Sequence, residues 1–268
     1  MSHAFVEDTA VEPRGEDRFA ATVTDRWSIG GRPNGGYLMG IALTALGRRL
    51  RHPDPLTSTG HFLSPAEPGP AEVFVNVVKE GRSLATAQAV LSQDRRERLV
   101  VLATYGDLAG TVGPTRIMEP TPLPAPGLVS SLGRPHPFPI AERFVLELPP
   151  EQALAADGRP TRTDGPAEFF GRIRFSDDMP AVTAALPLLM DAFPPAVFCL
   201  GMVGWTPTLE LTVHTRARPE PGWPEPGWMV LRTKSRYLKN GLVEEDGELW
   251  DGTGQLVAQS RQLARILV

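Results

Sequence analysis

The stretch from Asn34 to Leu50, NGGYLMGIALTALGRRL, constrains the fold of this chain more than any other. Asn34 follows a proline and is a favourable N-cap residue, so a helix is predicted to begin here. Apolar residues cover most of its circumference, and its only charges, Arg48 and Arg49, suit the helix dipole at the C-terminal end. A helix that is apolar nearly all round is buried, and at about 25 Å this one is too short for a membrane span.

Glycines interrupt this predicted helix at positions 35, 36, 40 and 47. Each one opposes helix formation by roughly 1 kcal/mol relative to alanine, so the fold has to compensate for them. On a helical wheel Gly36, Gly40 and Gly47 fall on one narrow line. Such a line lets another backbone come close, which predicts tight packing of this helix in the core.

The segments around the helix predict an antiparallel sheet. Alternating and β-branched residues predict strands at 18–27, 56–63, 71–79, 83–93 and 97–105, and residues 1–16 are interpreted as a lead-in without regular structure. Turns of a few residues join the strands that follow the helix, which makes their pairing antiparallel. One face of this sheet can wrap the apolar helix and bury it.

The second half of the chain repeats this order of elements. Residues 112–137 are rich in proline and predict a semi-extended linker between an N-terminal unit, 1–111, and a C-terminal unit, 138–268. Strands are predicted at 142–148 and 168–175, followed by a helical stretch at 179–193 capped by Asp177 or Asp178. Four more strands are predicted at 205–215, 228–237, 242–251 and 255–267. Each half therefore has a strand followed by a helix and then four strands, and the second half has one further strand before these.

A shift of 157 residues brings the two halves into register. It sets Asn34, at the start of the first helix, on Asp191 in the second helix, and it sets Leu99 on Leu256. With a gap in the middle, residues 57–59 align with residues 206–208. The shared order predicts two copies of one fold, with Asn34 and Asp191 at equivalent places on neighbouring helices.

Composition and missing motifs exclude several classes of function. The net charge is −4, which offers no basic field for nucleic acid. The single cysteine, Cys199, and an acidic N-terminus without a signal pattern predict a cytoplasmic protein. The chain has no G-x-S-x-G elbow, no nucleotide-binding glycine motif, and no histidines at metal-ligand spacing.

These features together resemble a known superfamily. The segments NGGYLMGIAL, TGHFLSPAEPG and VVKEGRSLATAQAVL are similar to the N-terminal repeat of the acyl-CoA thioesterase II and thioesterase-like proteins. The segments LPLLMDAF, TPTLELTVH and QLVAQSRQL are similar to their C-terminal repeat, so the resemblance covers about residues 18–110 and 140–267. It implies an α+β double hot-dog, two tandem repeats that each wrap an antiparallel sheet around a central helix.

The resemblance also implies a site and its ligands. An aspartate, a hydroxyl residue and a glutamine that activate water match Asp191, Thr208 and Gln262, with Thr206 as the other choice for the hydroxyl. It implies an acyl-CoA substrate and no metal or organic cofactor. It further implies assembly of at least a dimer, in keeping with the exposed edges of such sheets. Tyr105, opposite Gln262 by the shift, breaks the trio in the first half, so one active site per chain is expected.

The chemistry of these residues is consistent with thioester hydrolysis. Asp191 lies among apolar neighbours, which should raise its pKa and suit it to act as a general base. The amides of Asn34, Gly35 and Gly36 open the first helix and could bind the thioester carbonyl. Structural alternatives stay open for each position: a helix-capping aspartate, glycines that only allow close packing, and ordinary strand residues at Thr208 and Gln262.

Two rival functions follow from the same fold. One is an acyl-CoA-binding protein without turnover. The other is a hot-dog enoyl-CoA hydratase or dehydratase, which would use an aspartate and histidine pair, but no histidine stands beside the second predicted helix. A free-thiol assay over acyl-CoAs of graded length would separate these three functions.

Overall fold

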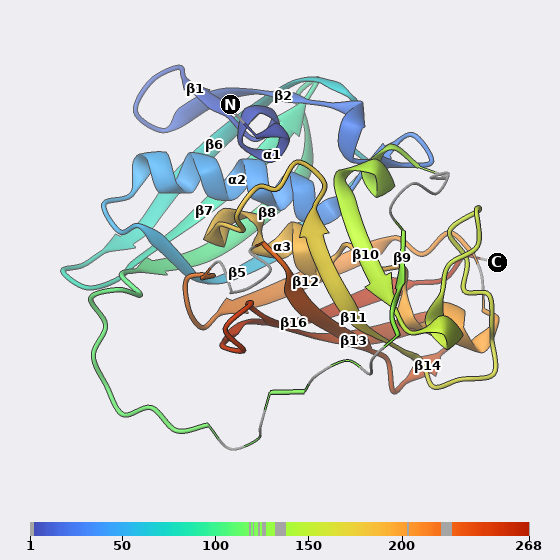
Figure 1. Cartoon of the computed structure of the whole chain (residues 1–268). Coiled ribbons are helices and arrows are strands. Elements are labelled where there is room, and N and C mark those ends of the chain that lie inside the picture. The colour runs from blue at the N-terminus through green and yellow to red at the C-terminus, as the bar shows by residue number, and fades with distance from the viewer. Residues whose placement is uncertain are drawn as a thin grey trace.

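The computed structural model describes residues 3–117, 119, 121–122, 124, 127–131, 138–202, 204–220 and 227–267. In these residues nearly all strands belong to one large antiparallel sheet, as the sequence predicted, and the longest helix lies across its N-terminal strands (Figure 1). One two-stranded pair stands apart from this sheet, directly before the long helix. A continuous apolar core contains residues from both halves of the chain.

The N-terminal half contains two helices, a 3-10 turn and eight strands among the described residues. They are α1 (Ala4–Asp8), β1 (Val11–Pro13), β2 (Arg18–Val23), η1 (Asp25–Trp27), β3 (Ser28–Ile29), β4 (Arg32–Pro33), α2 (Gly35–Arg49), β5 (Asp54–Phe62), β6 (Gly69–Glu80), β7 (Ala85–Gln93) and β8 (Arg96–Gly106). The four predicted strands after the helix are confirmed with small changes at their ends, but the first predicted strand, 18–27, ends at Val23, and Asp25–Trp27 forms η1.

The C-terminal half has one short α-helix, four 3-10 turns and the remaining strands of the described chain. They are β9 (Val129–Ser130), η2 (Pro139–Arg143), β10 (Phe144–Leu148), η3 (Pro150–Gln152), β11 (Glu168–Phe175), η4 (Thr183–Ala185), α3 (Leu186–Met190), η5 (Ala196–Leu200), β12 (Thr208–Thr215), β13 (Met229–Lys234), β14 (Leu238–Lys239), β15 (Leu242–Trp250) and β16 (Leu256–Arg265).

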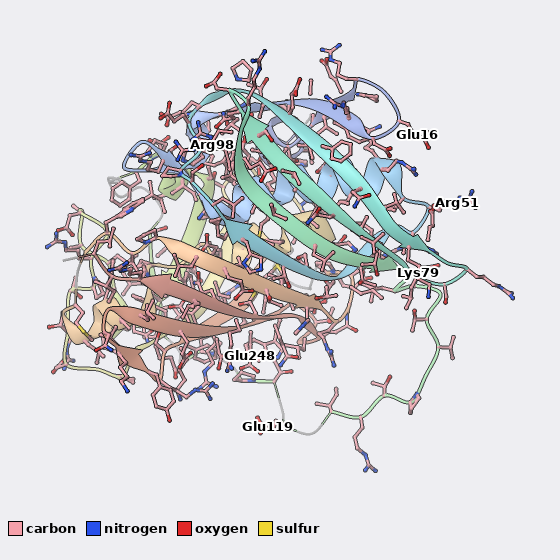
Figure 2. All side chains as sticks on the ribbon, turned by 180° about the vertical axis from the view of Figure 1, so that it is seen from behind. Glu16, Arg51, Lys79, Arg98, Glu119 and Glu248 are labelled. Carbon is pink, nitrogen blue, oxygen red and sulfur yellow. The ribbon has the colours of Figure 1, made fainter. Side chains whose placement is uncertain are left out.

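The strand order relates the two halves. The sheet runs β1-β2-β6-β7-β8-β5-β12-β16-β15-β13-β11-β10-β9, with β14 paired to β15. In the N-terminal half the strand before the helix, β2, pairs with β6, and in the C-terminal half the corresponding strand, β11, pairs with β13. The first long strand after the helix, β5 in one half and β12 in the other, lies in the middle of the sheet, next to the other half. β5 and β12 then pair with each other, with Thr59 opposite Thr212. Figure 2 shows this continuous sheet from behind, with side chains covering the face turned away from the helices.

Helix α2 forms as predicted. The Asn34 side chain caps it by accepting a hydrogen bond from the Tyr37 amide at 2.9 Å, and Arg48 and Arg49 occupy its last turn. The helix packs on β7, where alternate residues point inward and are buried: Ala85, Ala87, Ala89 and Leu91. No helix in the described part of the chain is long and apolar enough to cross a membrane.

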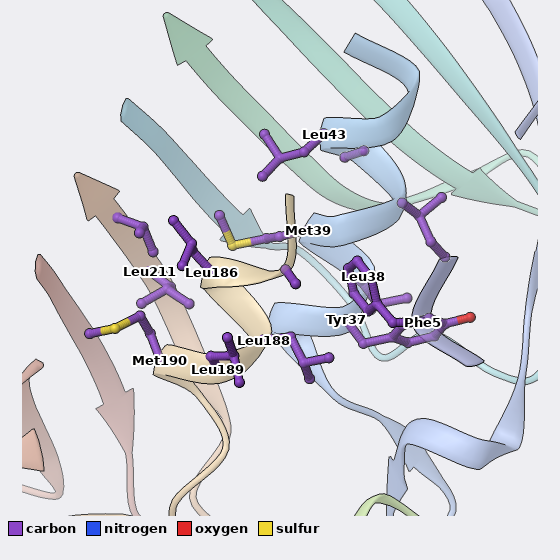
Figure 3. Packing of buried hydrophobic residues seen from close by; sticks show 14 of the residues in the cluster. Phe5, Tyr37, Leu38, Met39, Leu43, Leu186, Leu188, Leu189, Met190 and Leu211 are labelled. Carbon is purple, nitrogen blue, oxygen red and sulfur yellow. The ribbon is translucent and has the colours of Figure 1, made fainter. Parts of the chain in front are cut away.

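The backbone of α3 lies directly against α2. A Cβ atom at Gly36 would stand 2.4 Å from the Pro187 carbonyl oxygen and 2.6 Å from the Leu188 Cα, so only glycine fits this crossing. Figure 3 shows the short α3 beside α2, with the Met39 side chain extending from α2 towards α3. The predicted close approach of another backbone is therefore confirmed at Gly36.

The other glycines of the predicted line behave differently. Gly40 faces the ring of Phe5, which would lie 2.8 Å from a Cβ atom there. Gly47 is exposed, and the nearest atom to a Cβ atom at that position, on Tyr105, is 3.9 Å away. Backbone contact thus accounts for one glycine of the line and side-chain packing for a second.

The prediction that residues 1–16 lack regular structure is wrong. They form α1 and β1, and Phe5 is 2% exposed because it fills the space that Gly40 leaves open. The Phe5 ring meets Trp27 edge to face at 6.0 Å, and the buried Asp8 carboxylate accepts a hydrogen bond from the Trp27 indole at 2.8 Å. A five-residue helix is too short to show in a periodicity, so its tertiary contacts decide its structure.

The predicted second helix is too long. Only Leu186–Met190 is α-helical, preceded by the 3-10 turn Thr183–Ala185. Pro187 is the reason, because a proline is tolerated in the first turn of a helix but clashes in its interior. Neither predicted cap lies at this helix: the Asp177 carboxylate accepts hydrogen bonds from Met179 and Ala4 amides, and Asp178 has a positive φ of 55°.

The predicted linker, 112–137, is described only at residues 112–117, 119, 121–122, 124 and 127–131, and its other residues lie outside the described part. Val129 and Ser130 form β9 at the end of the sheet, paired with β10. The Thr121 hydroxyl donates to the Gly254 carbonyl at 2.6 Å, so this segment contacts the C-terminal half.

Candidate functional site

A large cavity lies between the start of α2, the end of α3, the first residues of β12 and β15, and the last residues of β16. Its volume is about 1140 Å³. Most of its wall is apolar and includes Leu38, Phe62, Phe144, Leu146, Phe193 and Phe198. A smaller polar group lines the same cavity, namely Asn34, Gly35, Asp191, Thr206, Thr208, Glu245 and Gln262. An apolar cavity with a few converging polar groups is the usual form of a small-molecule site.

Asp191 follows the last residue of α3 and is held by the first turn of α2. Its Oδ2 atom accepts hydrogen bonds from the Asn34 side-chain amide at 2.8 Å and from the Gly36 backbone amide at 3.3 Å. The close crossing of the helices at Gly36 makes this contact possible. The Oδ1 atom accepts no hydrogen bond from the described residues, so it is the oxygen that can take a proton from a bound molecule.

The environment of Asp191 changes its acidity as the sequence predicted. Burial raises the pKa of Asp191 from its ordinary value of 3.8 to about 6, although the hydrogen bonds from Gly36 and Asn34 act in the opposite direction. What remains exposed of this residue faces the cavity. A carboxylate with a pKa near 6 is a better general base close to neutral pH than a surface aspartate.

Thr208 and Gln262 meet across the pair of strands β12 and β16. The Thr208 hydroxyl donates to Gln262 Oε1 at 2.8 Å, and both residues line the cavity with Asp191. Thr206 also lines the cavity, but its hydroxyl donates to the Gly204 carbonyl at 3.1 Å. The structure therefore joins Gln262 to Thr208, the hydroxyl that the gapped alignment favoured.

A second buried carboxyl, Glu245 on β15, completes this polar group. Its Oε1 accepts a hydrogen bond from Gln262 Nε2 at 2.9 Å, and its Oε2 accepts one from the Ala196 amide at 2.6 Å. Burial raises the pKa of Glu245 to about 7, and the negative charge of Asp191 adds to this increase. Both carboxyls line the same cavity.

Glu245 is a residue that the sequence pattern alone did not single out. Within LVEEDGELW the alternation of β15 places Val243, Glu245, Gly247 and Leu249 on the buried face. An acid in that row is unusual, because a carboxylate is rarely buried without partners. The alternation of the strand was therefore a signal that could have found it.

The three residues predicted to bind the carbonyl all lie at the cavity end of α2. The Asn34 side chain and the Gly36 backbone amide both donate hydrogen bonds to Asp191. Gly35 lines the cavity, and its N–H belongs to the first turn, where a helix offers no carbonyl partner. Of the three predicted residues, Gly35 therefore has the backbone amide that is best placed to donate to a ligand in the cavity.

Other chemistries find little support in the described residues. None of those that line the cavity is a histidine. No group of three or more His, Cys, Asp or Glu side chains in the described part could hold a metal ion. The cavity wall therefore combines a carboxyl, Asp191, and a hydroxyl, Thr208, with a helix N-terminus that favours negative charge.

Comparison with known proteins identifies a family whose models match this chain and relatives that resemble it. The family model described as the acyl-CoA thioesterase N-terminal domain matches residues 23–106, and the one described as the acyl-CoA thioesterase C-terminal domain matches residues 119–266. An uncharacterised protein of Mycobacterium tuberculosis is 28% identical over 271 residues, which cover 92% of this chain and 90% of that protein.

Solved structures resemble the whole chain. A candidate thioesterase II from Thermobifida fusca is 33% identical, with 99% of this chain and 98% of that one covered and a TM-score of 0.87. A hot-dog protein of unknown function from Alicyclobacillus acidocaldarius is 22% identical, covers 100% of this chain and 99% of its own, and gives a TM-score of 0.81. At that identity the second likeness shows the fold alone.

Proposed function

The chain belongs to the acyl-CoA thioesterase family, and from this premise we propose that it hydrolyses a fatty acyl-CoA to the free acid and CoA. The observation that carries this proposal is the Asp191 carboxyl, fixed through Oδ2 by Asn34 and Gly36 at the wall of an apolar cavity with Oδ1 left open. A base in this position can activate water beside a bound acyl group.

The proposed reaction follows from the atoms around the cavity. A water molecule donates one hydrogen bond to Asp191 Oδ1 and the other to the Thr208 oxygen, whose own proton is directed to Gln262. As Asp191 takes a proton, the water oxygen bonds to the thioester carbon, and the Gly35 N–H stabilises the developing oxyanion. When the tetrahedral intermediate collapses, the C–S bond breaks and the CoA sulfur receives the proton from Asp191.

The shape of the cavity supports a large apolar acyl group. Its volume of about 1140 Å³ exceeds the range of roughly 300–1,000 Å³ that is usual for drug-sized ligands. Arg32 and Arg159 also line it and are exposed, so cationic partners for the phosphates of CoA stand at its rim. The carboxylates differ in exposure: Asp157 is exposed beside Arg159, whereas Asp191 is half-buried and Glu245 is buried.

We further propose that the fold is a double hot-dog, with units at 1–111 and 138–268 joined by the linker 112–137. The matching strand order of the two halves and their antiparallel junction at β5 and β12 support this proposal. The fold of the Alicyclobacillus acidocaldarius protein supports it too.

A free-thiol assay over acyl-CoAs of graded chain length tests the proposed function. Release of CoA that depends on the protein and saturates with acyl-CoA supports thioesterase activity. Tight binding of acyl-CoA without thiol release would identify a binding protein. Hydration of an enoyl-CoA without thiol release would identify a hydratase, although the described cavity wall holds no histidine for that reaction.

The rate should depend on pH through Asp191. Because only the ionised carboxylate accepts a proton, we expect kcat to rise with pH around a midpoint of about 6, the pKa to which burial raises Asp191. Asn34→Ser keeps a side-chain acceptor for the helix cap but removes the amide donor to Asp191, so it should move the midpoint to higher pH. A flat profile between about pH 5 and pH 8, with hydrolysis rate-limiting, would contradict a base with this pKa.

Thr208 and Thr206 provide a matched pair. Thr208→Ala removes an acceptor for the proposed water and should lower kcat roughly tenfold, the effect of one hydrogen bond of about 1.4 kcal/mol. Thr206→Ala should leave kcat near the wild-type value, since the Thr206 hydroxyl bonds the Gly204 carbonyl. Steady-state kinetics of both variants decide between the two hydroxyls, and a larger loss in Thr206→Ala would reverse their roles.

A further inference from the structure

The proposed mechanism leaves one buried polar group without a task. Glu245 lines the cavity and is 7% exposed, and the three residues Thr208, Gln262 and Glu245 form a continuous hydrogen-bonded row. Glu245 and Gln262 stand directly opposite each other on β15 and β16. A buried acid in such a row needs a structural or a functional explanation.

The chemistry of a carboxylate fixes the direction of this row. Above the pKa of about 7 to which burial raises Glu245, its carboxylate can only accept hydrogen bonds, so it selects the NH₂ end of the Gln262 side chain as its neighbour. The oxygen end of the same amide then faces Thr208, where it can only accept. The Thr208 hydroxyl must therefore donate its proton to Gln262, and its lone pairs remain for a ligand in the cavity.

Without this acid the row has no fixed direction. The two ends of a glutamine amide have nearly the same shape, so a neutral partner at position 245 would allow the Gln262 amide to turn over. In the turned state an N–H would face Thr208 and occupy the lone pair that the proposed water needs. The orientation of the Thr208 hydroxyl thus depends on Glu245, which bonds Gln262 and not Thr208.

We infer that Glu245 is a positioning residue that acts through Gln262, orienting its amide so that Thr208 offers a lone pair to the attacking water. The inference rests on the thioesterase activity proposed above. The second oxygen of Glu245 accepts from the Ala196 amide, which anchors the row to η5 and keeps the carboxylate from turning. Residues of η5, β15 and β16 therefore act together to set the direction of the Thr208 hydroxyl.

The first test reads the orientation of the amide without any substrate. The side-chain NH₂ signals of Gln262 in a nitrogen–proton correlation spectrum are assigned by their loss in Gln262→Ala. In the wild type we expect them to be shifted downfield and slow to exchange, because they donate to a buried carboxylate. In Glu245→Gln they should move towards the position of an ordinary glutamine, and signals that do not move would overturn the inference.

The second test is a double-mutant cycle on kcat. Glu245→Gln should lower kcat about tenfold with little change in KM, since it disturbs water orientation and not acyl binding. In the Gln262→Ala background the same substitution should have no further effect, because the residue through which it acts is absent. An equal loss in both backgrounds, or a loss seen mainly in KM, would assign Glu245 a role in cavity structure instead.

Matched variants keep these outcomes interpretable. Glu248→Gln makes the same change on the same strand at a part-exposed position, and it should alter neither the Gln262 signals nor kcat. Urea unfolding of each variant checks that the fold is intact. If the wild type releases no thiol but the spectra respond as expected, then the proposed function fails while the orientation of Gln262 by Glu245 stands.

Discussion

Replacing Asp191 with asparagine is expected to lower kcat for acyl-CoA hydrolysis by about 10²–10⁴-fold, the usual contribution of a general base. The asparagine keeps the size of the side chain and an oxygen that accepts from Asn34 and Gly36, but it cannot take a proton from water. Acyl-CoA binding should change little, so most of the loss should appear in kcat. A variant with full activity would remove Asp191 from the mechanism.

The same substitution should make the folded protein more stable near neutral pH. The pKa of Asp191 is raised from 3.8 to about 6 in the folded state, so the favourable contribution of its neutral form is present below pH 3.8 and is lost as the pH rises through about 6. Above that range the ionised group disfavours folding by up to about 3 kcal/mol, because a tenfold change in an acid dissociation constant corresponds to about 1.4 kcal/mol.

Urea unfolding at two pH values measures this effect. Relative to the wild type, Asp191→Asn should raise the free energy of unfolding at about pH 7, and the gain should disappear near pH 3.5, where Asp191 is largely protonated in both states. Loss of activity together with a gain in stability is typical of a group kept for function. A variant that is less stable at both pH values would instead indicate that Asp191 holds the helices together.

The second large effect is expected at Gly36. In Gly36→Ala the new methyl group would stand 2.4 Å from the Pro187 carbonyl oxygen, which belongs to backbone and cannot swing aside. Overpacking of this kind reduces the free energy of unfolding by about 1–3 kcal/mol. The added atom also pushes α3 away from α2, and a displacement of about 1 Å at Asp191 can lower the rate about 10²-fold.

Gly47→Ala is the matched control for this prediction. It makes the same change in the same helix, but the nearest atom is 3.9 Å from the new Cβ, which is an ordinary contact. Replacing an exposed helical glycine with alanine should therefore stabilise the protein by about 0.5–1 kcal/mol without changing kcat. The midpoint temperatures of thermal unfolding should move in opposite directions for the two variants, and only Gly36→Ala should lower kcat. A similar loss in both would show that helix α2 tolerates no change along this line.

The sequence predicted most of the sheet because the relevant signals are local. Alternation along single strands and short turns between them require no knowledge of the rest of the chain. The neighbouring positions of Asn34 and Asp191 were also predicted, and their side chains do bond. Their predicted equivalence on the two helices is wrong, because Asn34 precedes α2 whereas Asp191 follows α3. Both predictions use only the positions of residues along the chain.

The remaining features depend on tertiary contacts that spacing does not reveal. The short α1 forms because Phe5 fills the space above Gly40, and α3 is short because Pro187 restricts where a helix can begin. The alternation of β15 places Glu245 in the buried row, but its partner Gln262 is revealed only by the pairing of β15 with β16. The direction of the Thr208 hydroxyl depends on that pairing as well.

The junction of β5 and β12 makes the two halves one cooperative unit. Across it the Thr59 and Thr212 hydroxyls bond at 2.9 Å, and Arg218 forms a bidentate ion pair with the buried Asp54. Asn34 and Gly36, which hold the carboxyl of Asp191, come from the half that does not contain it. Separating the halves would thus open the sheet and remove the hydrogen bonds that hold the Asp191 carboxyl at the same time, so the proposed turnover would report on the integrity of this junction.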